Sequence, residues 1–410
     1  MGRGHATKNK EHSSGSLSLP GLPSLLSSKI MKVENRVNCA NLSFCSKLYA
    51  FRYMLIVCCF MLIALSTLLF ALSSEARVAG NCSNCHTMHN SQGGSSVAKD
   101  FDGSSFSLTD TPKGNLLIYS CLGCHSATDG NTWQDIITKA PIVFNTIEPT
   151  YNTVKGLAGG NFYWVKNGDT KGHNILSPDA NLSVAPGAVA FTTCGTNSCH
   201  ANLDRVVSGA GSGLDGKQGC EKCHLDPKHH ANDHDYMVGG LVTNADQGWY
   251  RFLSGHEAGI GLGAEGYEDG DWQKTVSSVD HNEYLGYQNP GGYGFLMLGN
   301  TTTAYCTGCH GIFHTNQGSQ SPWLRHPSDA ILPVSGEYAN YKTYDPLVPV
   351  ARPSLDVPNA TVTPGTDMVM CLSCHRAHAS PDFKMMRWDY KSSTLSEALS
   401  GCNVCHSSKN

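Results

Sequence analysis

Apolar residues are spread unevenly along the chain and form a sustained run only near the N-terminus. Residues 53–72 are uncharged and almost wholly apolar, and Lys47 and Arg52 precede them. Small residues around Ala76 are typical of a signal peptidase site. We therefore predict a leader and signal peptide over residues 1–76. An uncleaved membrane anchor is the alternative, because the run is long enough to span a bilayer.

Beyond this run, apolar positions follow neither a helical nor a strand period for long. Short stretches predict helices over 132–140 and 394–399 and strands over 161–165 and 188–192. Gly-, Asn- and Pro-rich connectors fill the intervals. The predicted fold class is mostly coil with short α-helices and few short strands, and an ordinary apolar core looks thin.

Cysteine changes this picture, because 14 of the 18 cysteines fall in seven similar motifs. Six motifs read Cys-x-x-Cys-His, the attachment signature of a c-type haem, and one has four residues between its cysteines. The motif residues are Cys82, Cys85 and His86; Cys121, Cys124 and His125; Cys194, Cys199 and His200; Cys220, Cys223 and His224; Cys306, Cys309 and His310; Cys371, Cys374 and His375; Cys402, Cys405 and His406. The other four cysteines all lie in the first sixty residues, so the count does not indicate a disulfide framework.

The motifs predict seven covalently attached haems (heme c), with each motif histidine as the proximal iron ligand. We expect residues 77–410 to form one heptahaem cytochrome c domain. Much of it should be loop wrapped over porphyrin, because the macrocycles supply the apolar surface that side chains normally supply. We also expect that the haem-free polypeptide does not fold.

Ten further histidines lie beyond residue 77, enough to give every iron a second histidine ligand. The predicted distal ligands are His89, His173, His230, His281, His314, His326 and His378. The last two distal places stay open among His229, His230, His234, His256 and His281, from which His230 and His281 are chosen.

Three of these histidines, His89, His314 and His378, follow a proximal histidine by three or four residues. A side chain one helical turn from the proximal ligand lies on the same face of that haem and cannot reach its opposite face. We therefore expect each of the three to ligate a different haem. Such ligation would hold neighbouring haem edges close together.

Charge excludes one class of partner. Residues 1–76 carry eight of the 29 basic residues and three of the 33 acidic residues, so 21 basic and 30 acidic residues remain in residues 77–410. A net charge of −9, to which haem propionates would add, argues against nucleic acid as a partner.

Several stretches resemble the outer-surface multihaem c-type cytochromes of metal-respiring bacteria, which polymerise into extracellular filaments. They are residues 82–90, 171–175, 324–327 and 371–380. The resemblance implies a coil-rich fold around a continuous chain of stacked bis-histidine haems. It also implies that His89 ligates a haem in the adjacent subunit, with the haem of Cys371, Cys374 and His375 as the candidate recipient. The chain departs from six-haem members in its fourth motif and in residues 231–290, which carry no haem motif.

The leading hypothesis is therefore an exported, non-enzymatic electron conduit, extracellular or at the outer cell surface, that self-associates into filaments through His89. Other multihaem cytochromes would be its electron donors, and an extracellular metal oxide or another terminal acceptor would receive the electrons. The chain would contact a membrane only through its signal segment. Two alternatives are a soluble periplasmic shuttle and a multihaem reductase with one open haem site.

Overall fold

The computed structural model describes much of the chain in twelve stretches. They are residues 50–61, 81–101, 105–151, 156–175, 203, 216–225, 227–231, 239–254, 263–275, 277–288, 300–307 and 326–408. The chain divides into two compact units, Met1–Leu72 and Ser73–Asn410.

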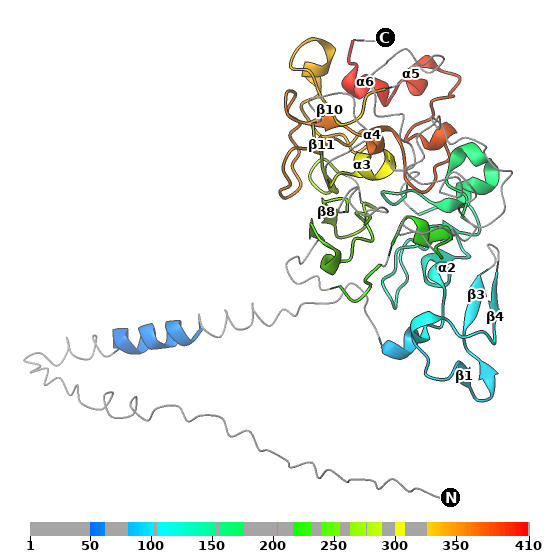
Figure 1. Cartoon of the computed structure of the whole chain (residues 1–410). Helices are drawn as coiled ribbons and strands as arrows, with labels where there is room; N and C mark the ends of the chain where they lie inside the picture. Colours follow the sequence, from blue (N-terminus) through cyan, green and yellow to red (C-terminus); the bar gives the residue numbers. More distant parts are fainter. Residues whose placement is uncertain are drawn as a thin grey trace, which may run out of the picture. The chain divides into compact units, whose positions relative to one another are not determined.

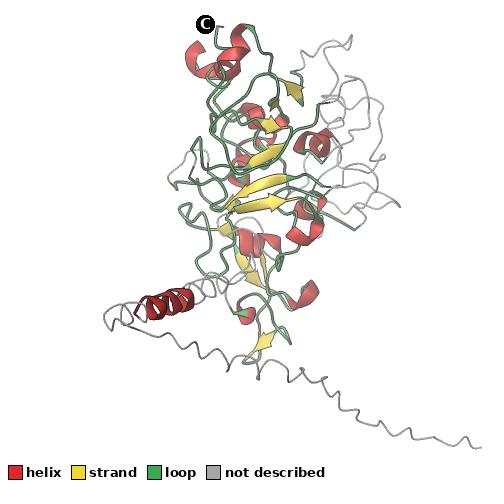
Figure 2. Ribbon diagram, turned by 90° about the vertical axis from the view of Figure 1, so that its left-hand side faces the viewer, coloured by secondary structure: helices red, strands yellow, loops and turns green. Residues whose placement is uncertain are grey.

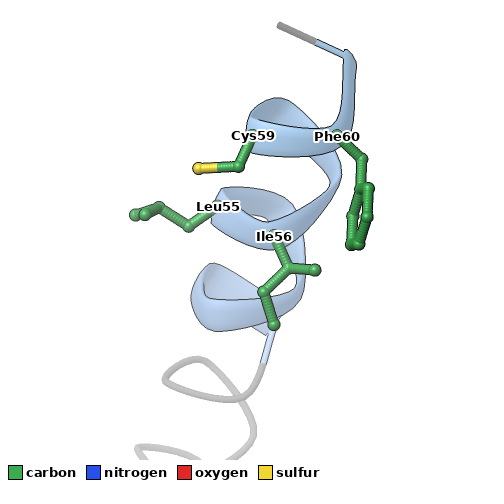
Figure 3. Close-up of a pocket in the computed structure, with 4 residues that line it drawn as sticks. All are labelled: Leu55, Ile56, Cys59 and Phe60. Carbon is green, nitrogen blue, oxygen red and sulfur yellow. The ribbon is translucent and has the colours of Figure 1, made fainter. Parts of the chain in front are cut away.

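The described part of the first unit is a helix over residues 50–61. Its large apolar side chains are exposed, and Figure 3 shows Leu55, Ile56, Cys59 and Phe60 around one apolar hollow on this helix. This helix contains the first part of the predicted signal segment, whereas residue 76 lies outside the described residues. Among the residues that the structure describes, no helix is both long and apolar enough to cross a membrane.

The second unit is mostly coil, with helices of three to six residues (Figure 1). The α-helices are α2 (Cys121–His125), α3 (Thr302–Thr307), α4 (Cys371–Cys374), α5 (Leu395–Ala398) and α6 (Cys402–Cys405). The 3₁₀-helices are η1 (Cys82–Asn84), η2 (Gly114–Leu116), η3 (Phe162–Asn167), η4 (Asp169–Lys171), η5 (Gly219–Lys222), η6 (Ala245–Gln247), η8 (Gly336–Asn340) and η9 (Phe383–Met385). This architecture confirms the predicted coil-rich fold class, and six of these turns hold cysteines of the haem motifs.

The strands are short and form one larger sheet and three strand pairs (Figure 2). The pairs are β1 (Ser91–Gln92) with β2 (Ser95–Ser96), β3 (Lys99–Phe101) with β4 (Phe106–Leu108), and β5 (Ser126–Ala127) with β6 (Phe144–Asn145). The six-stranded sheet has the order β10-β12-β11-β9-β8-β7, with β7 (Gly239–Val242), β8 (Gly266–Asp269), β9 (Glu283–Leu285), β10 (Ala330–Ile331), β11 (Ala351–Arg352) and β12 (Met368–Val369).

Residues 231–290 contribute three strands to the six-stranded sheet. Strands β7, β8 and β9 come from this segment, and β9 joins β11 in parallel, with Tyr284 opposite Ala351. Val242, Phe252, Tyr284 and Met368 are buried on this sheet in one apolar cluster. The haem-free insertion is thus built into the same sheet as the C-terminal part of the chain.

A second apolar cluster lies beneath the last two motifs. Tyr341, Tyr344 and Trp388 are almost fully buried there, and Cys374 and Cys405 pack against them. The attachment cysteines are therefore part of the apolar core, as expected where haem supplies part of that core.

Two local predictions are wrong. Residues 132–140 form a turn, because the Asp135 side chain accepts from the N–H groups of Ile137 and Thr138 and Lys139 takes a positive φ of 60°. Residues 161–165 lie at η3 because the Asn161 side chain accepts from the N–H of Tyr163 and caps a 3₁₀-helix. The predicted strand over 188–192 lies outside the described residues.

The helix predicted over residues 394–399 is confirmed as α5. Thr394 is its N-cap, and its hydroxyl accepts from the N–H of Glu397 at 3.4 Å. The Glu397 carboxylate in turn accepts from the Thr394 hydroxyl at 2.9 Å. Residue 401 then begins the turn of the last motif.

Candidate haem sites

Each described haem motif makes a helical turn that brings its two cysteines to one side of the backbone, because residues three apart on a turn share a face. In four motifs the histidine N–H donates to the first cysteine's carbonyl at 2.8–3.1 Å. These bonds join His86 to Cys82, His224 to Cys220, His375 to Cys371 and His406 to Cys402. The turn therefore places the two thiols and the adjacent imidazole close together along the backbone.

Four proximal histidines are held by a hydrogen bond from Nδ1. The acceptors are the carbonyl of Asn115 for His86 at 3.0 Å, that of Pro141 for His125 at 2.9 Å, that of Lys384 for His375 at 2.9 Å, and Oε1 of Glu337 for His406 at 3.0 Å. A proton on Nδ1 leaves the lone pair on Nε2, and such contacts typically orient metal-binding imidazoles. The residues present therefore fit a haem iron at Nε2.

Four motif histidines each have a second histidine ring nearby, at a nearly constant separation. Ring centroids are 6.1 Å apart for His86 and His230, 6.1 Å for His125 and His229, 6.1 Å for His224 and His378, and 6.2 Å for His326 and His406. This is too far for ring stacking. It matches two imidazoles on opposite sides of one metal ion, each nitrogen about 2 Å from it, which gives roughly 6 Å between ring centres.

The pair of His224 and His378 is the most enclosed of the four. The N–H of His378 donates to the Gly159 carbonyl at 2.7 Å, and a Cβ on Gly159 would lie 2.9 Å from the His378 Nδ1. Burial lowers the pKa of His224 to about 4 and that of His378 to about 3. Both rings are therefore neutral at pH 7, the form that can donate a lone pair to iron.

His375 differs from the four motif histidines that have a facing histidine ring. Among the described residues, no histidine ring faces it at the separation seen in the four pairs. His173 interacts with it electrostatically, and Nδ1 of His173 donates to the Ala377 carbonyl at 2.8 Å. Within the described part of the chain, His375 thus has no facing histidine ring.

His281 lies in a buried polar network. Its Nδ1 is 3.2 Å from the Ser277 carbonyl, its Nε2 is 3.1 Å from Oε1 of Glu283, and its ring stacks on Tyr344 at 3.6 Å. Both ring nitrogens contact oxygen atoms of the protein, so neither is directed at a position that an iron could occupy. This geometry does not favour the predicted distal role of His281. It favours His229, which faces His125 and which the sequence left as an open alternative.

The remaining predicted site residues, which are iron ligands and attachment cysteines, fall into two groups. His89 is exposed at the end of the first motif, beside Met88, whose exposure is 75%. The others lie outside the described residues: Cys194, Cys199, His200, Cys309, His310 and His314, together with the alternatives His234 and His256.

Attachment cysteines of different motifs also meet. Cys121 and Cys220 lie close enough to shift each other's pKa, and so do Cys306 and Cys371. Helices α3 and α4, which carry Cys306 and Cys371, pack together. The second motif is therefore adjacent to the fourth, and the fifth to the sixth.

Comparison with known proteins points to the same chemistry. No family model matches the chain. The chain is 26% identical over 377 residues to the C-type cytochrome OmcS of Geobacter sulfurreducens, covering 77% of this chain and 81% of that protein. Two solved structures, an Outer Membrane Cytochrome S filament and the OmcS nanowires of Geobacter sulfurreducens, match with 18% and 19% identity.

These structural matches each cover 82% of this chain and 100% of the other, with TM-scores of 0.40 and 0.41, too low to establish a common fold. The sequence comparison stands independently of them. Over three quarters of its length, the chain is similar in sequence to a c-type cytochrome, which confirms the resemblance to multihaem c-type cytochromes predicted from its motifs.

Proposed function

We propose that this chain is an electron-transfer protein with seven covalently attached, predominantly bis-histidine haems. One observation carries the proposal: four pairs of histidine rings stand 6.1–6.2 Å apart, and each pair contains one motif histidine. Such pairs provide both axial ligands of a haem iron. When bound, each haem supplies a one-electron iron couple.

From the ring pairs we infer four distal ligands: His230, His229, His378 and His326 for the haems of His86, His125, His224 and His406, respectively. His173 and His314 then remain for the haems of His200 and His310, and His89 of another copy remains for the haem of His375. This set differs from the sequence prediction in one position, because His229 replaces His281.

In this arrangement the histidines position the haem irons along a fixed path for electron transfer. They perform no chemistry on a substrate. Two imidazoles on each iron leave no coordination position for a small molecule. Nδ1 hydrogen bonds fix the ring orientations, and the contacts between Cys121 and Cys220 and between Cys306 and Cys371 bring neighbouring attachment edges together. We therefore propose a conduit and not an enzyme.

We further propose export through the signal segment and assembly of copies into an extracellular filament. Support comes from the exposed His89, from the unpaired face of His375 among the described residues, and from the relative whose solved structures are filaments. Other multihaem cytochromes would deliver electrons, and a metal oxide or another terminal acceptor would receive them. A periplasmic shuttle is the alternative location and role.

Mass and spectroscopy test the proposal on the secreted holoprotein. We expect a mass increase of seven haems and a low-spin spectrum for every iron in the assembled form. Electron microscopy of the same preparation should show filaments. A high-spin component that binds nitrite or cyanide in the assembled form would support a reductase instead, and discrete particles at high protein concentration would support a shuttle.

A further inference from the structure

The histidine of the last haem motif has a different hydrogen-bond acceptor from three other motif histidines. Nδ1 of His406 lies 3.0 Å from the carboxylate oxygen Oε1 of Glu337. In the other three, Nδ1 lies 2.9–3.0 Å from a backbone carbonyl oxygen; these are His86, His125 and His375. The distances are alike, so the difference lies in the charge of the acceptor.

Glu337 is held in place by the residues that follow the motif. It belongs to η8, and this short helix packs against α6, which carries the last two attachment cysteines. The Ser408 hydroxyl donates to the second carboxylate oxygen, Oε2, at 3.1 Å, and the Ser407 hydroxyl donates to the Glu337 carbonyl at 2.8 Å. The Glu337 side chain is 12% exposed. The contact with His406 is therefore supported from both segments and partly shielded from water.

A carboxylate is a stronger hydrogen-bond acceptor than a carbonyl. A glutamate ordinarily ionises at about pH 4.3, so it carries a negative charge at pH 7. Hydrogen bonds to an ionised acceptor are about twice as strong as neutral ones. Glu337 need not be isolated for this effect, because a carboxylate that meets further groups keeps its charge. When a carboxylate accepts from Nδ1 of an imidazole, the ring becomes a stronger base at Nε2, the nitrogen left for iron.

We propose that Glu337 acts through His406 as a positioning residue that lowers the reduction potential of the haem on Cys402, Cys405 and His406. A more basic imidazole donates more electron density to the iron. The oxidised iron carries one more positive charge than the reduced iron, so the stronger donor favours the oxidised form. The inference rests on the proposed attachment of a haem at this motif.

The proposed effect gives a direction to electron transfer between two neighbouring motifs. Cys374 of the sixth motif packs in the same apolar cluster as Cys402 and Cys405 of the last motif. His375 of the sixth motif donates to the Lys384 carbonyl, a neutral acceptor. The acceptors behind the two histidines therefore favour passage of an electron from the last haem to the sixth.

The ring geometry at the last motif gives its haem a recognisable spectrum. The ring of His326 lies at 88° to that of His406, whereas the other three facing pairs lie at 22°, 36° and 60°. Low-spin haems with perpendicular imidazole planes give a more anisotropic electron paramagnetic resonance signal than those with parallel planes. The anisotropic signal that is lost in His326→Ala is assigned to this haem.

The test is a redox titration of the secreted holoprotein and its Glu337→Gln variant, followed by this signal. Glutamine keeps the size of the side chain and a neutral oxygen acceptor, so the charge is what is removed. The midpoint of the last haem should move to higher potential. At the midpoint of the parent protein, the ratio of reduced to oxidised haem should rise about tenfold, the order expected when a charge-assisted hydrogen bond becomes neutral. The other haems should keep their midpoints.

Asp345→Asn separates the hydrogen bond from the effect of a nearby charge. Burial, Cys402 and the charge of Asp345 raise the pKa of the Cys405 thiol, so Asp345 lies close to the same motif. Its carboxylate accepts from the N–H of Leu347 at 2.8 Å, a contact that an asparagine oxygen can also make. This variant should move the midpoint much less. A shift as large as that of Glu337→Gln would overturn the proposal, because any nearby acid would then suffice.

Haem counting by mass distinguishes the possible failures. A parent protein without a haem on the last motif would refute the proposed function, whereas seven attached haems with an unchanged midpoint in Glu337→Gln would refute this inference alone. If Glu337→Gln does not fold or loses this haem, Ser408→Ala decides, since Ser408 is exposed. That variant takes one donor from the Glu337 carboxylate, so the hydrogen bond from His406 strengthens and the midpoint should fall. An unchanged or higher midpoint in Ser408→Ala would overturn the proposal.

Discussion

The imidazole rings of His224 and His378 face each other with their centroids 6.1 Å apart, although His378 belongs in sequence to the sixth motif and His224 to the fourth. His378 follows His375 by three residues, yet its ring points to another motif. This is the arrangement expected when a second histidine one turn from a proximal ligand cannot reach the far side of its own haem. One short segment can therefore tie two haems together.

Removing His378 should expose one iron without detaching its haem. His378→Ala is expected to keep seven thioether-bound haems, because Cys220, Cys223 and His224 are untouched, and to convert one haem to high spin. Electron paramagnetic resonance of the oxidised protein measures the change. The control is His378→Met, which offers another axial ligand and should restore a low-spin haem at higher potential. An entirely low-spin His378→Ala protein would show that this ring is not a ligand.

His229 and His281 give the sharpest comparison between the sequence prediction and the structure. His229→Ala should produce a high-spin haem, because His229 faces His125. His281→Ala should keep every haem low-spin but lower the free energy of unfolding by about 1–3 kcal/mol, since Glu283 and Ser277 lose a buried donor. Spectra and denaturant unfolding of the two holoproteins measure both effects. The opposite spectral result would restore His281 as the ligand.

The attachment residues could be predicted from the sequence because the haem motif has a fixed local spacing, and the distal candidates could be predicted only as a set, from the number of histidines. The sequence could not choose between His229 and His281. Both lie between the fourth and fifth motifs and outside any motif, and the choice depends on the contact of His281 with Glu283 and on its stacking against Tyr344. The sequence prediction chose His230 alone of the neighbours His229 and His230. In the structure the two side chains diverge, so that His229 faces His125 and His230 faces His86.

Local sequence limits the prediction of the fold in the same way. Helical turns at the motifs were predictable from local spacing, whereas the six-stranded sheet depends on pairing between distant segments such as Tyr284 and Ala351. Two-residue strands carry almost no periodic signal. Residues 132–140 were wrongly predicted as helix because the side-chain cap of Asp135 competes with helical bonding, a choice that hydrophobic spacing does not record.

The buried carboxyl group of Asp329 should make the stability of the protein depend on pH. Its side chain is 5% exposed, its Oδ1 has no hydrogen-bond partner, and burial raises its pKa to about 6. A carboxyl group with a raised folded-state pKa stabilises the fold when protonated, and this contribution is lost as pH rises through about 6. Asp329→Asn should therefore raise stability at pH 8 by about 2–3 kcal/mol.

This substitution suits the site, because Asp329 has a φ of 50°, which asparagine tolerates, and an amide oxygen can still accept from the Thr301 hydroxyl. Denaturant midpoints of the holoprotein at pH 4.5 and 8 measure the effect. At the lower pH the variant and the parent should differ much less. Equal stability at pH 8 would mean that the carboxylate is well accommodated when charged.

His89 provides the test of assembly. His89→Ala should keep seven attached haems, abolish filaments and leave one iron high-spin, because among the described residues no histidine ring is paired with His375 and the missing ligand would come from another copy. Electron microscopy and electron paramagnetic resonance measure the two effects together. Met88→Ala, at the neighbouring residue, should leave every iron of the assembled protein low-spin. Disassembly of the unmodified filament should reproduce the high-spin signal of His89→Ala, since both remove the same ligand. Filaments that persist in His89→Ala would assign cross-subunit contact to other residues.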